Sequence, residues 1–171
     1  MIKLKLVTTL FLFFCISAVT AQDISKMIDV KALAVQSKLV EWRRHIHQNP
    51  ELGNREFKTA AYIVEHLKTL GFEIKTNVGK TGVVAILKGG KPGPCIALRA
   101  DIDALPVKER VNISFASKDS ADYLGQKVPV MHACGHDVHT TCLLGAARIL
   151  QQLKDQWEGT VKLIFQPGEE K

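Results

Sequence analysis

The sequence predicts an α/β fold, in which short apolar strands alternate with amphipathic helices along the chain. Apolar residues recur at intervals of three and four over residues 30–47 and again over residues 56–70, which is the spacing of one buried helix face. A third helix with this pattern is expected to begin near residue 137 or 139 and to end near residue 154. Short runs of mainly apolar residues indicate strands at residues 73–77, 83–87, 95–99 and 160–166.

The first two helices have recognisable ends. Asn49 and Pro50 close the first helix, and Gly71 stops the second. His45 and His47 lie in the last turn of the first helix, where an imidazole interacts favourably with the negative end of the helix dipole. We therefore expect these two histidines to have a structural role.

The segments between the predicted strands contain one turn and one long loop. GGKPGP, from Gly89 to Pro94, predicts a turn rather than a phosphate loop, because it lacks the Walker pattern and opens no helix. Residues 107–130 are polar and irregular, which predicts a loop over the site. Asp101 and Asp103 follow the third strand, and their spacing of two places both carboxylates on one side of an extended backbone. Either carboxylate could orient a ligand of a nearby metal ion.

The N-terminus has the pattern of a secretory signal peptide. Lys3 and Lys5 precede a short apolar run, and small residues follow up to Ala21. Cleavage after Ala21 would leave residues 22–171 as the mature chain, exported to the periplasm or secreted. The apolar run is too short for a stable membrane anchor.

The charge of the chain does not predict a nucleic-acid partner. The formal net charge is +6, and loss of the two lysines of the signal peptide would lower it to about +4. The basic residues are spread along the chain and form no patch. We therefore expect an ordinary solvated surface.

Cysteine usage argues against a disulfide framework. Cys15 would leave with the signal peptide, so that an odd number remains, namely Cys95, Cys134 and Cys142. Cys95 opens an apolar strand and Cys142 lies in an apolar helix, so we expect both in the core.

Metal-competent side chains are densest between Met131 and Thr140, where MHACGHDVHT contains His132, Cys134, His136, Asp137 and His139. Cys134 and His136 can turn toward one divalent ion if the backbone at Gly135 forms a tight turn. On a regular helix these two side chains would diverge. The spacing therefore indicates a pair of metal ligands on a loop before the third helix.

Three other interpretations of this segment remain open from the residues alone. A structural zinc site would need a second paired cluster, and the sequence contains no CxxC. Cys134 could be a thiol nucleophile activated by His136. The segment could also be a polar turn without chemistry.

Two carboxylates follow the last predicted strand. Pro167 and Gly168 end the strand, and Glu169 and Glu170 come directly after them. The carboxyl ends of strands are where open α/β sheets build their sites. In a metal hydrolase, one carboxylate of such a pair binds the ion while its neighbour takes a proton from water.

These motifs, in this order, resemble the M20 metallopeptidase family. The resemblance is strongest to its amidohydrolase branch, which includes hippurate hydrolases, N-acyl-amino-acid amidohydrolases and plant auxin-conjugate hydrolases. It extends from about residue 30 to the end of the chain. The segments that carry it are WRRHIHQNPELGNREFKTA (Trp42 to Ala60), RADIDALP (Arg99 to Pro106), MHACGHDVH (Met131 to His139) and FQPGEE (Phe165 to Glu170).

The resemblance implies a role for each candidate residue. Cys134, His136 and Glu170 would be metal ligands, with Cys134 bridging two divalent ions, which could be Zn, Mn, Co or Ni. Glu169 would be the general base. Asp103 would orient a ligand without binding the ion; other branches have a His ligand where this chain has Asp101.

The resemblance also implies a fold and an activity. The fold would be part of a zinc-peptidase-like catalytic domain, a mixed sheet flanked by helices. The activity would be metal-dependent hydrolysis of the amide bond of N-acyl amino acids or short peptides.

Members of this family continue beyond this point for more than the length of one further domain. That part supplies two further His ligands, the remaining strands and a lid domain through which the full-length form would be a homodimer. We therefore expect residues 22–171 to be the N-terminal portion of the catalytic domain and to be inactive alone. The alternatives are a non-catalytic metal-binding remnant and a Cys134 thiol enzyme.

Overall fold

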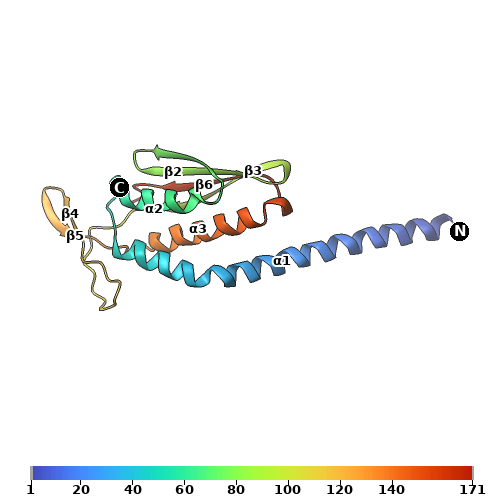
Figure 1. Ribbon diagram of the computed structural model, residues 1–171, viewed down its shortest axis with the longest axis horizontal. Coiled ribbons are helices and arrows are strands. Elements are labelled where there is room, and N and C mark those ends of the chain that lie inside the picture. Colours follow the sequence, from blue (N-terminus) through green and yellow to red (C-terminus); the bar gives the residue numbers. More distant parts are fainter. Residues whose placement is uncertain (1, 171) are drawn as a thin grey trace. The chain divides into compact units, whose positions relative to one another are not determined.

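The computed structural model describes residues 2–170, with side chains described from residue 24 onward. The chain divides into two compact units, Met1–Val35 and Gln36–Lys171. Helix α1 (Ile2–Gln48) supplies the described backbone of the first unit and continues into the second (Figure 1). The sheet and the candidate site lie in the second unit.

Helix α1 is longer than the sequence predicted. It ends where expected, before Asn49 and Pro50, but it begins at Ile2 rather than near residue 30. The physical reason is that neither Gly nor Pro occurs before Pro50, so nothing in the local sequence stops the helix. The predicted signal peptide, residues 1–21, lies outside the residues whose side chains are described. Among the described residues, no helix is both long and apolar enough to span a bilayer.

The second unit contains the predicted mixed sheet. Its four strands lie in the order β1-β2-β6-β3, with β1 and β2 antiparallel, β2 and β6 antiparallel, and β6 and β3 parallel. This arrangement confirms the α/β prediction. The strands are β1 (Glu73–Val78), β2 (Gly82–Lys88), β3 (Lys91–Asp101) and β6 (Glu158–Gln166).

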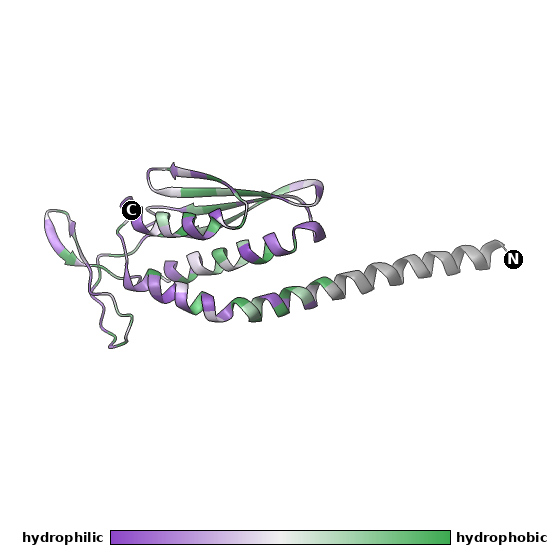
Figure 2. Cartoon of the chain, viewed as in Figure 1, coloured by the Kyte–Doolittle hydropathy of each residue, from purple (hydrophilic) through white to green (hydrophobic). Residues whose placement is uncertain are grey.

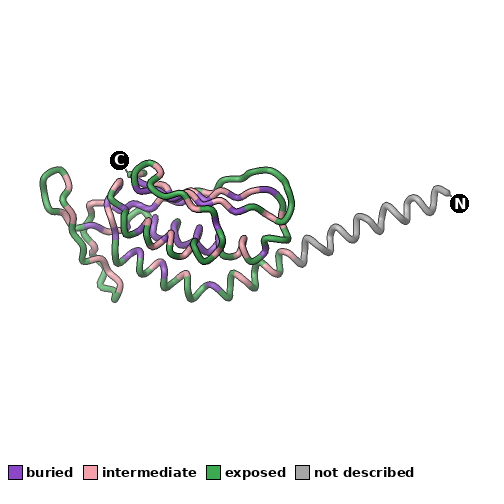
Figure 3. The backbone as a smooth tube through the Cα atoms, turned by 45° about the horizontal axis from the view of Figure 1, so that its top comes forward, coloured by how far each residue is buried: buried purple, intermediate pink, exposed green. Residues whose placement is uncertain are grey.

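Two helices cover one face of this sheet. Helix α2 (Phe57–Lys68) contacts β1 and β2, and helix α3 (His136–Gln152) contacts β3 and β6 (Figure 1). A short 3₁₀ helix, η1 (Lys154–Gln156), follows α3. Alternate residues of β6 are fully buried, namely Val161, Leu163 and Phe165, as period-two alternation predicts for a strand with one covered face. Figure 2 shows the apolar character of β2, and Figure 3 shows that buried residues gather in β2, β6 and the covering helices.

The outer strand β3 corrects two predictions. It begins at Lys91, so the expected turn is confined to Gly89 and Gly90, and Pro92 and Pro94 lie in an edge strand, where proline is tolerated. Cys95 is exposed on this edge and is not a core residue. Cys142 is also exposed, on α3. Both were expected in the core because the neighbouring residues are apolar, and the exposure of both side chains corrects that expectation.

The segment 107–130 is only partly irregular. Its second half forms a hairpin of β4 (Ser120–Tyr123) and β5 (Gln126–Pro129). Leu124 and Gly125 form its two-residue turn, both with positive φ, which matches the twist of a tight hairpin. The prediction of a continuous loop is therefore wrong here, because the strands are short and polar.

Candidate metal centre

The parallel pairing of β3 and β6 brings two acidic segments together. Asp101, the last residue of β3, pairs with Gln166, the last residue of β6. The chain segments that leave these strands therefore start at the same edge of the sheet. The backbone N–H of Glu170 donates a hydrogen bond to Asp103 Oδ2 (3.0 Å), which joins the two segments directly.

The third segment is the start of α3. Gly135 has φ +87°, in the left-handed region, and a Cβ at this position would meet no atom within 4 Å. Glycine is therefore favoured here by the backbone conformation and not by crowding. The helix begins at His136, slightly earlier than predicted, and the left-handed turn separates Cys134 from the regular helix.

This geometry brings the three predicted ligands together. One donor atom each of Cys134, His136 and Glu170 can be chosen so that all three atoms lie within 4.8 Å of one another. His136 is buried, whereas Cys134 and Glu170 are exposed. Sulfur, imidazole nitrogen and carboxylate oxygen are the donors that zinc and similar divalent ions take in proteins. The residues present therefore fit such an ion.

The structure separates the two glutamates of the pair. Glu170 belongs to the ligand group, whereas Glu169 lies beside it, with Oε2 3.8 Å from His136 Nε2 and a side chain that is 40% exposed. Glu169 is therefore outside the ligand group, next to His136 and open to solvent.

Asp103 fixes the orientation of His136. The Nδ1 atom of His136 lies 2.9 Å from the carbonyl oxygen of Asp103 and 3.2 Å from its Oδ1. Both residues are buried. With Nδ1 engaged as a donor, Nε2 is the atom left to bind an ion, which is the usual arrangement behind a metal-ligating histidine.

The electrostatics of the site favour a cation. A hydrogen bond to Glu170, together with slight desolvation and the negative charges of Glu170, Glu169 and Asp101, raises the pKa of the Cys134 thiol. The carboxylates therefore oppose the thiolate unless positive charge is added. A divalent ion would supply that charge and favour the thiolate.

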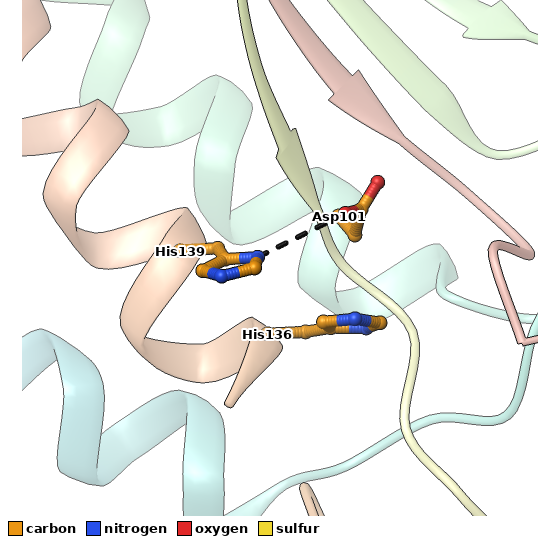
Figure 4. A group of neighbouring side chains, drawn as sticks. All are labelled: Asp101, His136 and His139. Atoms are coloured by element: carbon orange, nitrogen blue, oxygen red, sulfur yellow. Dashed lines mark ion pairs between the residues drawn. The ribbon is translucent and has the colours of Figure 1, made fainter. Parts of the chain in front are cut away.

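A second group of possible ligands consists of Asp101, His136 and His139 (Figure 4). His139 Nδ1 lies 3.8 Å from Asp101 Oδ2, while Arg99 Nη2 lies 2.7 Å from Asp101 Oδ1. Both groups contain His136, which has one ring nitrogen left to bind an ion and so cannot bind two ions at once. The two groups therefore belong to one centre and are not two separate sites. The sequence analysis named His139 among the metal-competent side chains but gave it no ligand role, although its spacing of three from His136 on a helix signals a shared face.

Behind the metal centre lies a buried ionic network that was not foreseen from the sequence. His47 is 5% exposed, and its Nδ1 and Nε2 atoms lie 2.8 Å from Asp137 Oδ2 and 2.9 Å from Glu109 Oε2. Arg43 Nε also lies 2.8 Å from Asp137 Oδ2. His47 thus joins the end of α1 to the start of α3, beyond the helix-dipole role predicted for it. No local pattern signals a pairing across 90 residues.

His132 differs from the other histidines of its motif. It is 4% exposed, and neither ring nitrogen has a hydrogen-bond partner among the described residues. Burial lowers the pKa of His132 to about 4. Its imidazole is therefore neutral at neutral pH.

Comparison with known proteins identifies relatives that match most of the chain. The sequence profile of peptidase family M20/M25/M40 matches residues 97–171. The chain is 44% identical over 151 residues to the N-acetyl-L-cysteine deacetylase of Bacillus subtilis, which covers 88% of this chain and 34% of the relative. It is 42% identical over 151 residues to the N-acyl-L-amino acid amidohydrolase of Geobacillus stearothermophilus, covering 88% and 38%.

A solved structure agrees with this relationship. The YXEP protein of Bacillus subtilis, described as a dinuclear metal-binding peptidase of the M20 family, is 44% identical and superposes with a TM-score of 0.72. The match covers 80% of this chain and 36% of that one. The chain spans about a third of the length of the curated relatives it matches. The sequence identity, the shared fold and the ordered motifs together relate the chain to the M20 peptidase family.

Proposed function

We propose that this chain is the ligand-bearing part of a metal-dependent amidohydrolase that cleaves the amide bond of N-acyl amino acids or short peptides. The observation that carries the proposal is the convergence of Cys134, His136 and Glu170, with the half-exposed Glu169 beside them and outside the ligand group. The names of the relatives support the substrate class, because they describe removal of acyl groups from amino acids.

The residues of the chain define how the reaction would be arranged. Cys134, His136 and Glu170 would hold divalent ions, which are two in number by analogy with the dinuclear relative and could be Zn, Mn, Co or Ni. When bound, such ions supply Lewis-acid chemistry, which lowers the pKa of water and polarises a carbonyl group. Glu169 would take the proton of the attacking water and return it to the leaving amine.

The site does not favour a cysteine nucleophile. Such enzymes lower the pKa of the thiol by placing positive charge beside it. In this chain the carboxylate of Glu170 raises the pKa of Cys134 instead. A non-catalytic metal-binding protein would share the ligand group, and it is distinguished from an enzyme by the role of Glu169.

Three further properties belong to the proposal. The pattern of residues 1–21 supports export to the periplasm or outside the cell, followed by release from the membrane. The dispersed charge favours a small-molecule substrate over nucleic acid. A homodimer is proposed for the full-length form from the resemblance to the M20 family.

The substitution Glu169→Gln tests the mechanism in the enzyme that carries this chain. A general base contributes roughly 10²- to 10⁴-fold to the rate, so amidase activity on an N-acyl amino acid should fall by that factor. Metal content should stay unchanged, because Glu169 lies outside the ligand group. Glu158→Gln, at the other end of β6, is the matched control and should retain full activity.

A chelator should abolish activity of the unsubstituted enzyme, and added Zn, Mn, Co or Ni should restore it. Full activity of the Glu169→Gln enzyme would refute the assigned base. Activity that survives chelation but is lost on alkylation would support the thiol enzyme.

A further inference from the structure

Glu56 is a buried acid that none of the assigned roles explains. It is 0% exposed, although glutamate is almost never fully buried without partners. It stands at the N-cap of α2, but its side chain makes no capping hydrogen bond there. Its carboxyl group instead contacts the loop that carries the glutamate pair.

The two oxygens of Glu56 have different partners. Oε1 accepts a hydrogen bond from the backbone N–H of Gly168 (2.8 Å), and Oε2 accepts one from the Thr81 hydroxyl. The first bond spans 112 residues of sequence and reaches the residue directly before Glu169. Glu56 therefore contacts the loop of the metal centre without belonging to the centre.

The loop at Gly168 is constrained from this same side. Gly168 has φ +59°, and a Cβ there would lie 2.8 Å from Asn54 Nδ2. The segment that contains Asn54 and Glu56 thus packs closely against the turn after β6. On the other side, Asp103 Oδ2 accepts the hydrogen bond of the Glu170 N–H. Two carboxyl groups therefore hold the backbone on either side of Glu169.

We propose that Glu56 is a positioning residue that fixes the turn carrying Glu169 and Glu170 relative to Cys134 and His136. The proposal depends on the metal-binding role given to this turn above. A carboxyl group suits the position because it offers two acceptors to two donors, the Gly168 N–H and the Thr81 hydroxyl. Loss of this acceptor leaves the partly buried Gly168 N–H without its partner and releases the turn.

The test measures Co²⁺ binding and amide exchange in the full chain. Co²⁺ bound by a thiolate gives a charge-transfer absorption, so a titration reports the affinity of the site that contains Cys134. Glu56→Ala should weaken Co²⁺ binding by about 10- to 100-fold, the range for groups that support metal ligands. Hydrogen exchange at the Gly168 amide, followed by NMR, should accelerate in the same variant.

Glu51→Ala is the matched control. Glu51 lies in the same segment, but its carboxylate accepts hydrogen bonds from Lys58 and Thr59 at the start of α2 and none from the glutamate turn. This variant should lose stability while keeping Co²⁺ affinity within about twofold, because its partners lie in the helix. A general loss of stability alone would therefore not produce the result expected for Glu56.

If Glu56→Ala does not fold, Glu56→Asp tests the positioning role of Glu56 instead. It keeps the carboxyl group but withdraws it by one methylene, so Gly168 should lose its acceptor and Co²⁺ affinity should fall several-fold. A folded Glu56 variant that keeps the Co²⁺ affinity and the Gly168 exchange rate of the unsubstituted chain would overturn the proposal. Absence of thiolate-bound Co²⁺ in the unsubstituted chain would instead refute the metal site, and Gly168 exchange would still decide whether Glu56 holds the turn.

Discussion

Cys134 is the residue whose reactivity reports most directly on the charges of the centre. A hydrogen bond to Glu170 and the nearby negative charges raise the pKa of its thiol in the metal-free protein. Glu170→Gln removes one of these charges, so the pKa should fall and alkylation at pH 8 should become faster. The rate of reaction with iodoacetamide measures the change.

The other exposed cysteines require a control in that measurement. Cys95 and Cys142 would also react, so both are replaced by serine in the background. In that background, excess Zn²⁺ should protect Cys134 from alkylation. A Glu170→Gln variant that reacts more slowly than its parent would contradict the electrostatic description of the site.

His132 should make the stability of the metal-free protein depend on pH. Burial lowers its folded-state pKa to about 4 from the ordinary value of 6.5. A lowered histidine pKa means that the unfolded chain binds the proton first, so stability is complete above pH 6.5 and declines as the pH falls toward 4. Lowering the pH from 7.5 to 5 should therefore reduce the free energy of unfolding by on the order of 2 kcal/mol through His132.

Urea denaturation in the presence of a chelator measures this loss. The variant His132→Gln should show a smaller difference in unfolding free energy between pH 7.5 and pH 5. His139→Gln, which alters a side chain that is 54% exposed, should keep the difference seen in the unsubstituted protein. Equal pH dependence in all three proteins would exclude a neutral buried His132.

Residues of the centre divide into those that a sequence can reveal and those that it cannot. Cys134, His136 and the glutamate pair stand in short segments whose composition already indicates ligands. The residues that support the centre are not indicated by the composition of their segments. His47 and Glu56 reach partners 90 and 112 residues away, and their neighbours in sequence suggest only a helix end and a loop. Such contacts depend on tertiary packing, which short-range patterns do not contain.

Among the elements, the turn before α3 is the feature on which the ligand group depends. Gly135 and Gly71 both have positive φ, and a Cβ at either position would meet no atom within 4 Å, but only Gly135 lies between two residues of the proposed ligand group. Replacement of either by alanine should cost roughly 1 to 2 kcal/mol through backbone strain alone. Thermal and urea unfolding should therefore give similar losses for Gly135→Ala and Gly71→Ala.

Metal affinity separates the two variants. Gly135→Ala should weaken Co²⁺ binding, because strain relief at residue 135 turns Cys134 away from His136. Gly71→Ala should bind Co²⁺ as the unsubstituted protein does. Equal affinity in both variants would show that the left-handed turn does not set the geometry of the ligands.

The elements themselves were largely predictable because their patterns are local. Apolar periodicity located α2 and the cores of all four strands of the main sheet to within a few residues. The prediction failed where apolar periodicity is weak and where no residue marks the start of a helix. The hairpin β4–β5 is short and polar, and α1 extends to Ile2 through a segment that contains no helix breaker.

For the molecule as a whole, we expect the β3 edge of the main sheet to determine whether copies of the chain associate. Strand β3 forms this edge, and Ile96 on it is 54% exposed. An open, partly apolar strand edge is a template for pairing between copies. The 171-residue chain should therefore self-associate as its concentration rises, as measured by analytical ultracentrifugation.

Ile96→Lys should increase the monomer fraction, because a charge on an edge strand opposes strand pairing. Leu124→Lys is the control, since Leu124 is 87% exposed at the tip of the separate β4–β5 hairpin. Equal effects of the two lysines would indicate association through general surface hydrophobicity and would contradict pairing through β3.

A Co²⁺ titration of the chain, followed by its absorption spectrum, asks directly whether the three ligands hold a metal ion together. We expect a thiolate charge-transfer band that disappears in Cys134→Ser, weakens in His136→Asn and in Glu170→Gln, and persists when Cys95 and Cys142 are both replaced by serine. Absence of the band, or its loss on replacement of Cys95 or Cys142 instead of Cys134, would contradict a metal centre formed by Cys134, His136 and Glu170.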